Sequence, residues 1–386
     1  MLSRLRSSAP RSHWSLGARW ARVSILALAC LGALLAGCNE NNGPAGPVEP
    51  TPTTTQVAWV GEFTSGFVQG PIVFDLVQTG TAVSGETVFS SPGLASIAPA
   101  HLFVEGTLQD GTLQLALDLD VVPTQITFTV DAGIDPQGKL SGSLALSDPP
   151  LQADVVCRPL PRGKTTIELA VNVPVSVKAM VFDGVHVWLS TTGDDDYVRM
   201  QTDGTLVDSV PVLLPGGAHW TSDALTYDGD MLWGHLPLTI QDPSGTHNAS
   251  RIIGFDSHGQ VARTFQIEHR THGLAFDGSR YWSLDGESLR LYAFDATGTV
   301  QASVPIEVPD PSHLEFDGEH FWTLGWAMSR LYALDADGRA VRIYDLPVSG
   351  FRFHSGIAVE GAYLWYGQAD PIQRQSSTDL YRLRLN

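Results

Sequence analysis

The segment LAFDGSRYWSL, residues 274–284, contains the pattern that decides the fold: an aromatic residue, Asp, Gly, three variable residues and Trp. The unit recurs five times, and its last copy is degenerate, with Val-Glu-Gly in place of aromatic-Asp-Gly. The acidic and Trp positions are Asp183 and Trp188, Asp228 and Trp233, Asp277 and Trp282, Asp317 and Trp322, and Glu360 and Trp365. They recur at intervals of 40 to 49 residues, which is typical of repeat architectures.

Each copy predicts four short strands. The first strand enters an Asp-Gly hairpin turn, where Gly supplies the positive φ, and the second strand carries the Trp. A third strand leads into a second Asp/Gly turn, and a fourth completes a propeller blade. The constant offset of Trp from the turn predicts a structural role for Trp, packed between blades. Five copies therefore predict an all-β, five-bladed propeller with four strands per blade over residues 163–386.

The fifth copy ends after its third strand. Residues 165–171, TTIELAV, precede the first copy and have strand character. We expect this segment to supply the missing strand and close the ring, because an open array would expose its terminal edges. A sixth blade built from the preceding region is the alternative.

The repeats resemble bacterial β-propellers of the glutamine-cyclotransferase-like, NHL and YVTN kinds. The resemblance covers about residues 163–386. It implies the architecture but no single activity, since these families include cyclases, lyases, lactonases and binding scaffolds. No catalytic residue of any family can be carried over to this chain.

Residues 57–162 show short alternating runs such as QITFTV, residues 125–130, separated by turns such as DPQG, residues 135–138. This spacing predicts a β-sandwich or a small barrel. The opening WVGEF, residues 59–63, is faintly similar to lipocalin-like barrels. The domain is interpreted as a spacer or interaction module, with a small-ligand barrel as the alternative.

The N-terminal residues 1–37 are predicted to be a secretory signal. They carry five Arg and no acid, followed by a short apolar run that ends in LAGC, residues 35–38. This motif resembles the lipobox of bacterial lipoproteins. The resemblance implies lipidation of Cys38, and Asn39 after it implies the outer rather than the inner membrane. The alternative is an ordinary signal peptide with a chance cysteine. Residues 38–56 are predicted to form the lipidated start and a Pro/Thr-rich tether.

Charge excludes one class of partner. The chain of 386 residues has 23 basic and 41 acidic side chains and a formal net charge of -18. A nucleic-acid-binding protein needs a basic face to displace counterions, so no nucleic-acid partner is expected. The three cysteines cannot form a disulfide framework.

A candidate ligand site is predicted at the mouth of the propeller channel. Innermost strands converge on the axis, and polar residues recur about five positions before the acidic residue of each repeat. The candidates are Lys178, Asp223, His272, His313 and His354. His and carboxylate groups can bind a divalent metal or exchange protons, whereas the alternative is that these groups cap strand ends and hydrate a polar channel.

A second candidate is an acidic loop that contains Asp194, Asp195 and Asp196. Carboxylate oxygens are ligands for Ca²⁺, but a solvated acidic loop is the alternative, and the loop lacks the Gly and Glu placement of an EF-hand. The chain has no G-x-S-x-G, H-E-x-x-H, P-loop or Rossmann motif.

These observations favour a membrane-anchored envelope lipoprotein whose propeller acts as a binding or assembly scaffold. The expected partners are the membrane, through Cys38, and an envelope protein or a peptide or saccharide ligand. The alternatives are an envelope enzyme of cyclotransferase-like or lyase-like activity at the channel mouth, and a small-ligand carrier that uses the first domain.

Overall fold

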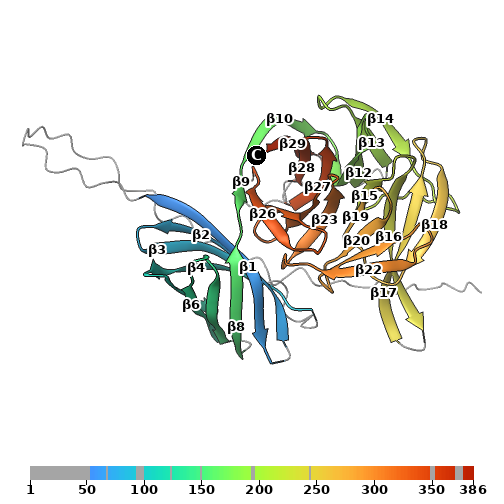
Figure 1. Ribbon diagram of the computed structural model, residues 1–386. Coiled ribbons are helices and arrows are strands. Elements are labelled where there is room, and N and C mark those ends of the chain that lie inside the picture. The colour runs from blue at the N-terminus through green and yellow to red at the C-terminus, as the bar shows by residue number, and fades with distance from the viewer. Residues whose placement is uncertain are drawn as a thin grey trace, which may run out of the picture. The chain divides into compact units, whose positions relative to one another are not determined.

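The computed structural model describes residues 53–66, 68–92, 100–121, 124–147, 150–192, 196–242, 245–347, 353–369 and 377–386. The predicted signal, Cys38 and most of the tether lie outside these residues, as do Asp194 and Asp195. The described part of the chain contains no helix with the length and apolar character needed to cross a membrane. Its elements are strands (Figure 1).

The first eight strands form a closed antiparallel barrel, so the barrel rather than the sandwich is found. They are β1 (Thr54–Ser65), β2 (Val68–Thr79), β3 (Ala82–Phe89), β4 (Ala100–Gln109), β5 (Thr112–Val121), β6 (Thr124–Ile134), β7 (Leu140–Ser147) and β8 (Pro150–Pro159). Side chains alternate between the interior and the outer face, as period-2 strands require.

Aromatic side chains fill the barrel interior. Phe63, Phe74, Phe89 and Phe128 are buried there with aliphatic neighbours. The rings of Phe63 and Phe89 lie 5.5 Å apart, and those of Phe89 and Phe128 lie 6.0 Å apart. These packed aromatic and aliphatic side chains form the core of the barrel.

Five four-stranded sheets follow and form the predicted propeller, so the first region does not add a sixth blade. Blade I is β11 (Ser176–Phe182), β12 (Val187–Thr192), β13 (Asp196–Met200) and β14 (Leu206–Pro211). Blade II is β15 (Leu225–Tyr227), β16 (Leu232–Asp242), β17 (Gly245–Phe255) and β18 (Val261–Ile267). Blade III is β19 (Gly273–Phe276), β20 (Tyr281–Asp285), β21 (Arg290–Phe294) and β22 (Val300–Pro305). Blade IV is β23 (Pro311–Phe316), β24 (Phe321–Gly325), β25 (Arg330–Leu334) and β26 (Ala340–Asp345).

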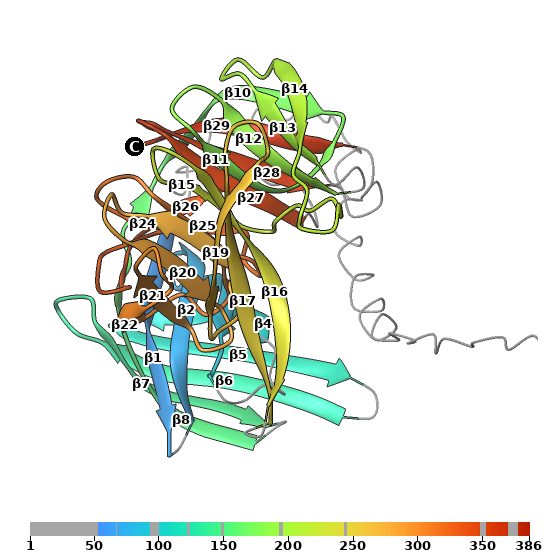
Figure 2. The ribbon, with the colours of Figure 1, turned by 90° about the vertical axis from the view of Figure 1, so that its right-hand side faces the viewer.

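Blade V contains both ends of the propeller. It consists of β27 (Phe353–Glu360), β28 (Tyr363–Ala369), β29 (Thr378–Leu385) and β10 (Thr165–Val173). Strand β10 pairs antiparallel with β29 from Thr165–Leu385 to Val173–Thr378, which confirms the expected closure of the ring. Figure 2 shows the green β10 beside the red β29. The short β9 (Arg162–Gly163) pairs parallel with β26 at the outer edge of blade IV.

The repeated acidic residue and Trp form one hydrogen-bonded unit. In blade III, Oδ1 of Asp277 accepts the backbone N–H groups of Ser279 and Arg280, and Oδ2 accepts Nε1–H of Trp282 at 2.7 Å. Gly278 provides the turn with a φ of 92°. Burial alone would raise the pKa of Asp277, but these donors lower it to about 2. In each of the other four repeats, the indole N–H of the Trp donates an equivalent hydrogen bond of 2.6 to 2.8 Å to the carboxylate of the repeated acidic residue.

An apolar face of the barrel packs against blades III and IV. Val60, Val73 and Val88 point out of the barrel and are nevertheless fully buried, in one cluster with Trp282 and Leu334. Burying outward-facing apolar side chains removes them from water and stabilises the contact.

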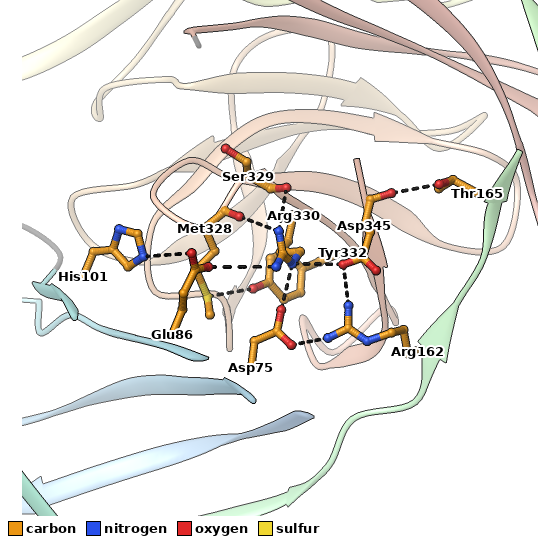
Figure 3. A network of polar contacts seen from close by, with 10 residues as sticks. All are labelled: Asp75, Glu86, His101, Arg162, Thr165, Met328, Ser329, Arg330, Tyr332 and Asp345. Carbon is orange, nitrogen blue, oxygen red and sulfur yellow. Dashed lines mark hydrogen bonds and ion pairs between the residues drawn. The ribbon is translucent and has the colours of Figure 1, made fainter. Parts of the chain in front are cut away.

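Ion pairs surround this contact (Figure 3). Asp75 on β2 accepts hydrogen bonds from Arg162 and, at 2.7 Å, from Nε of Arg330 on blade IV. Arg162 also donates to Asp345 at 2.5 Å. Asp75 has only 6% of its surface exposed, so both guanidinium groups compensate a nearly buried charge.

Candidate functional site

The innermost strands β11, β15, β19, β23 and β27 contact one another in a ring around the axis, as predicted. The five candidate residues lie at the beginning of these strands or directly before them. His313 donates its backbone N–H to the carbonyl of His272 at 3.1 Å, which links blades III and IV at this end. His313 also lies within electrostatic reach of His354 and Asp223. The structure therefore brings the predicted mouth residues together.

Apolar side chains close the channel beneath the mouth. Met180, Leu225, Leu274 and Ile357 surround a cavity of about 10 Å³ beside His313. One water molecule needs roughly that volume or more, so the space is effectively filled. Apolar side chains thus occupy the axis at this depth.

Two of the predicted imidazoles hold neighbouring loops. Nδ1 of His272 accepts the backbone N–H of Gly286 at 3.1 Å. Nε2 of His354 donates to the carbonyl oxygen of Trp326 at 3.3 Å, so its Nδ1 accepts the hydroxyl of Tyr366 at 2.9 Å. These bonds match the strand-capping alternative, and they fix each ring as a neutral tautomer.

The mouth histidines are neutral at pH 7. Burial lowers the pKa of His313 to about 4, and the nearby His354 and His272 lower it further while Asp223 opposes the shift. Burial also lowers the pKa of His354 to about 4 and that of His272 in the same direction. A base with a pKa near 4 is poorly matched to proton transfer at neutral pH.

His235 is a mouth residue that the sequence did not single out as a candidate. It is 3% exposed, and neither ring nitrogen has a hydrogen-bond partner among the described residues. Burial lowers its pKa to about 4, with Asp223 and His272 as electrostatic neighbours. Its position in the sequence could have identified it: His235 lies two residues after Trp233, and residues two apart in a strand share one face, here of β16.

Charged groups pair at the rim. Nζ of Lys178 donates to the hydroxyl of Thr221 at 3.0 Å and lies 3.7 Å from Oδ1 of Asp223. The Asp223 side chain is 70% exposed, so it remains available to a ligand. Arg270 and Glu287 form a second exposed pair at 3.5 Å.

No group of three His, Cys, Asp or Glu side chains that could hold a metal ion occurs in the described ranges. The mouth candidates therefore do not form a metal site in this arrangement. In the acidic loop, Asp196 instead accepts the hydroxyl of Ser209 at 2.9 Å and contacts Nδ1 of His219 at 3.2 Å.

Comparisons with known proteins bear on the fold alone. No protein-family profile matches the chain, and no curated protein matches it in sequence. Among solved structures, a glutaminyl cyclase from Myxococcus xanthus is similar, with 16% identity over 59% of this chain and 98% of that one and a TM-score of 0.44. The PQQ-bound aldose sugar dehydrogenase from Streptomyces coelicolor has 13% identity over 58% and 99% of the two chains and a TM-score of 0.37. A protein of unknown function from Bacteroides caccae has 14% identity over 60% and 81%, with a TM-score of 0.32.

Proposed function

We propose that the protein is an envelope lipoprotein, anchored through Cys38, whose propeller mouth binds a peptide or saccharide ligand without transforming it. The observation that carries this proposal is the use of the mouth imidazoles: His272 and His354 are occupied in holding loops. Both imidazoles are neutral at pH 7, because burial lowers the pKa of each.

The groups proposed to recognise the ligand lie on the rim. Trp326 is 46% exposed on the turn that His354 holds, and Asp223 and Arg270 present exposed charges. An aromatic surface with a few polar groups is the usual composition of a recognition site. Because the ring of blades holds this rim in place, little ordering is required on binding.

The proposal is tested by binding of the full chain to peptide and saccharide arrays. Trp326→Ala and Asp223→Asn should each weaken binding about tenfold, as expected for contacts at the centre of an interface. Val156→Ala, which removes an exposed apolar side chain from β8 of the barrel outside both candidate sites, is the matched control and should leave this binding unchanged.

Catalysis would contradict the proposal. If the purified protein converted peptide or lactone substrates, and lost that activity on His272→Ala, the enzyme alternative would replace it. The anchor has its own test: Cys38→Ala should abolish both lipid labelling and retention in the membrane fraction.

A further inference from the structure

A second cavity lies on the outer face of the barrel, where β1 to β5 meet Arg330 of blade IV. Its volume is about 670 Å³, within the range of roughly 300–1,000 Å³ that is usual for ligand sites. It shares no residue with the mouth. The side chains that matter for its chemistry are Asp75, Glu86, Phe103, Glu105, Leu117 and Arg330.

At this cavity the neighbouring strands β4 and β5 of the barrel separate, and this point of separation is called the fork. Strands β4 and β5 pair only from Glu105–Ala116 to Gln109–Thr112. Over the described backbone, β4 continues through residues 100–104 beside β3, and β5 continues through residues 117–121 beside β6. The facing edges of these two segments therefore have no strand partner among the residues that the structure describes. An unpaired edge is a template for an added strand.

The cavity has more negative than positive charge. Arg330 is engaged by Asp75 at 2.7 Å and by Asp345 at 3.2 Å, and reaches Glu86 only at 3.9 Å. Oε2 of Glu86 has no hydrogen-bond partner in the described part of the chain. Glu105 is exposed and has no ion-pair partner among the described residues. Glu105 is thus left for a cationic ligand, and Glu86 adds negative charge beside it, held only by contacts of 3.8 Å to Nε2 of His101 and 3.9 Å to Arg330.

An exposed aromatic ring, that of Phe103, lies opposite Glu86 in the register of β3 and β4. Phe103 is 65% exposed and stands beside His101, with ring centroids 5.0 Å apart. Phe103 and Glu105 share one face of β4, since residues two apart in a strand point the same way. The outer face of β4 therefore carries an apolar side chain, Phe103, at the free edge and an acidic one, Glu105, directly beside it at the last pair with β5.

We propose that this fork binds an extended basic peptide segment as an added strand along β4. Its backbone would pair with the free edge at residues 100–104. Its Lys or Arg side chains, at alternate positions, would reach Glu86 and Glu105, and their aliphatic stems would cover Phe103. Arg330 stays paired with Asp75 and closes the propeller side of the site.

The test uses the full chain and a fluorescent, capped heptapeptide that alternates lysine and valine, with anisotropy as the readout. We expect saturable binding that weakens as salt screens the charges. Glu105→Gln should weaken binding about fivefold and Phe103→Ala about tenfold. Glu105 is exposed and unpaired, so its substitution leaves the fold intact. Glu62→Gln, an exposed acid on β1 outside the cavity, is the matched control and should have no effect.

Two further peptides separate strand addition from simple charge attraction. A glutamate-valine heptapeptide should not bind, and N-methylation of alternate backbone amides should abolish binding of the lysine peptide. The proposal is overturned if the lysine peptide does not bind, if Glu105→Gln and Phe103→Ala leave its affinity unchanged, or if the N-methylated peptide binds equally well. Loss of binding on Trp326→Ala would instead assign the peptide to the mouth.

Discussion

Tyr281 of blade III donates its hydroxyl to Oδ2 of Asp228 in blade II at 2.6 Å. The same oxygen accepts Nε1–H of Trp233 at 2.7 Å. One carboxylate thus joins the turn and the indole of its own blade to the neighbouring blade, and the Trp233 and Tyr281 rings are 5.0 Å apart.

Asp228→Asn should destabilise the propeller by about 2 kcal/mol, because the amide places a donor where Trp233 and Tyr281 both donate. The measurement is the thermal unfolding midpoint by calorimetry. Asp203→Asn is the control, since the exposed Asp203 accepts a backbone N–H that an Asn oxygen can also accept. An equal loss in both variants would contradict the shared-carboxylate role.

Asp75→Asn should destabilise the protein by about 3 kcal/mol, because it removes the buried one of the two carboxylates that Arg162 and Arg330 share and leaves only the half-exposed Asp345. Limited proteolysis should then cut more readily between barrel and propeller. Asp208→Asn breaks the exposed pair with Arg199 and should cost less than about 1 kcal/mol. Identical unfolding curves for Asp75→Asn and the wild type would show that the network does not hold the two domains.

The buried mouth histidine His235 should make the protein sensitive to acid. Its pKa is about 4 when folded, against about 6.5 when unfolded, so the unfolded state binds the proton more tightly. Stability is therefore fully present above pH 6.5 and falls by up to about 3 kcal/mol as the pH drops through 4. His235→Gln should flatten this pH dependence in denaturant titrations, whereas His258→Gln, at a mostly exposed side chain, should not. An unchanged slope in His235→Gln would refute the assignment.

Cys157 should be inert in the folded protein. It is 1% exposed inside the barrel, and burial raises its pKa to about 12, with a further rise from Glu307. At pH 8 the thiolate should be roughly a thousandfold rarer than for an ordinary thiol. Iodoacetamide labelling of a variant with Cys30→Ser and Cys38→Ser measures this, and unfolding in denaturant should restore rapid reaction. Rapid labelling of the native protein would contradict it.

The propeller was predictable because its information is local. The spacing of Asp277, Gly278 and Trp282 encodes a turn, a carboxylate acceptor and an indole donor within seven residues, and five repetitions define five blades. The closure of the ring through β10 was also predictable. The last repeat lacks its fourth strand, and a segment with strand character precedes the first repeat, so pairing the two ends completes the blade. The barrel was predicted only as one of two β architectures, since alternation specifies a half-buried sheet but not its closure.

Non-local features required the folded chain. His235 lies beside Asp223 and His272 at the mouth because separate strands of the sequence meet there, and His272 holds a loop through its bond to the backbone of Gly286. The sequence did not indicate that Val60 and Val73, which face out of the barrel, are covered by the surface of the propeller.

The sequence by itself determined the number of blades, the turns and the strand that closes the ring, because hydrogen bonds between near neighbours specify them. Only the tertiary structure decided the filled barrel, the closed channel, the docking of Asp75 with Arg330 and the fork between β4 and β5. Each of these depends on side chains and backbone groups that lie far apart in sequence and meet only when whole sheets pack.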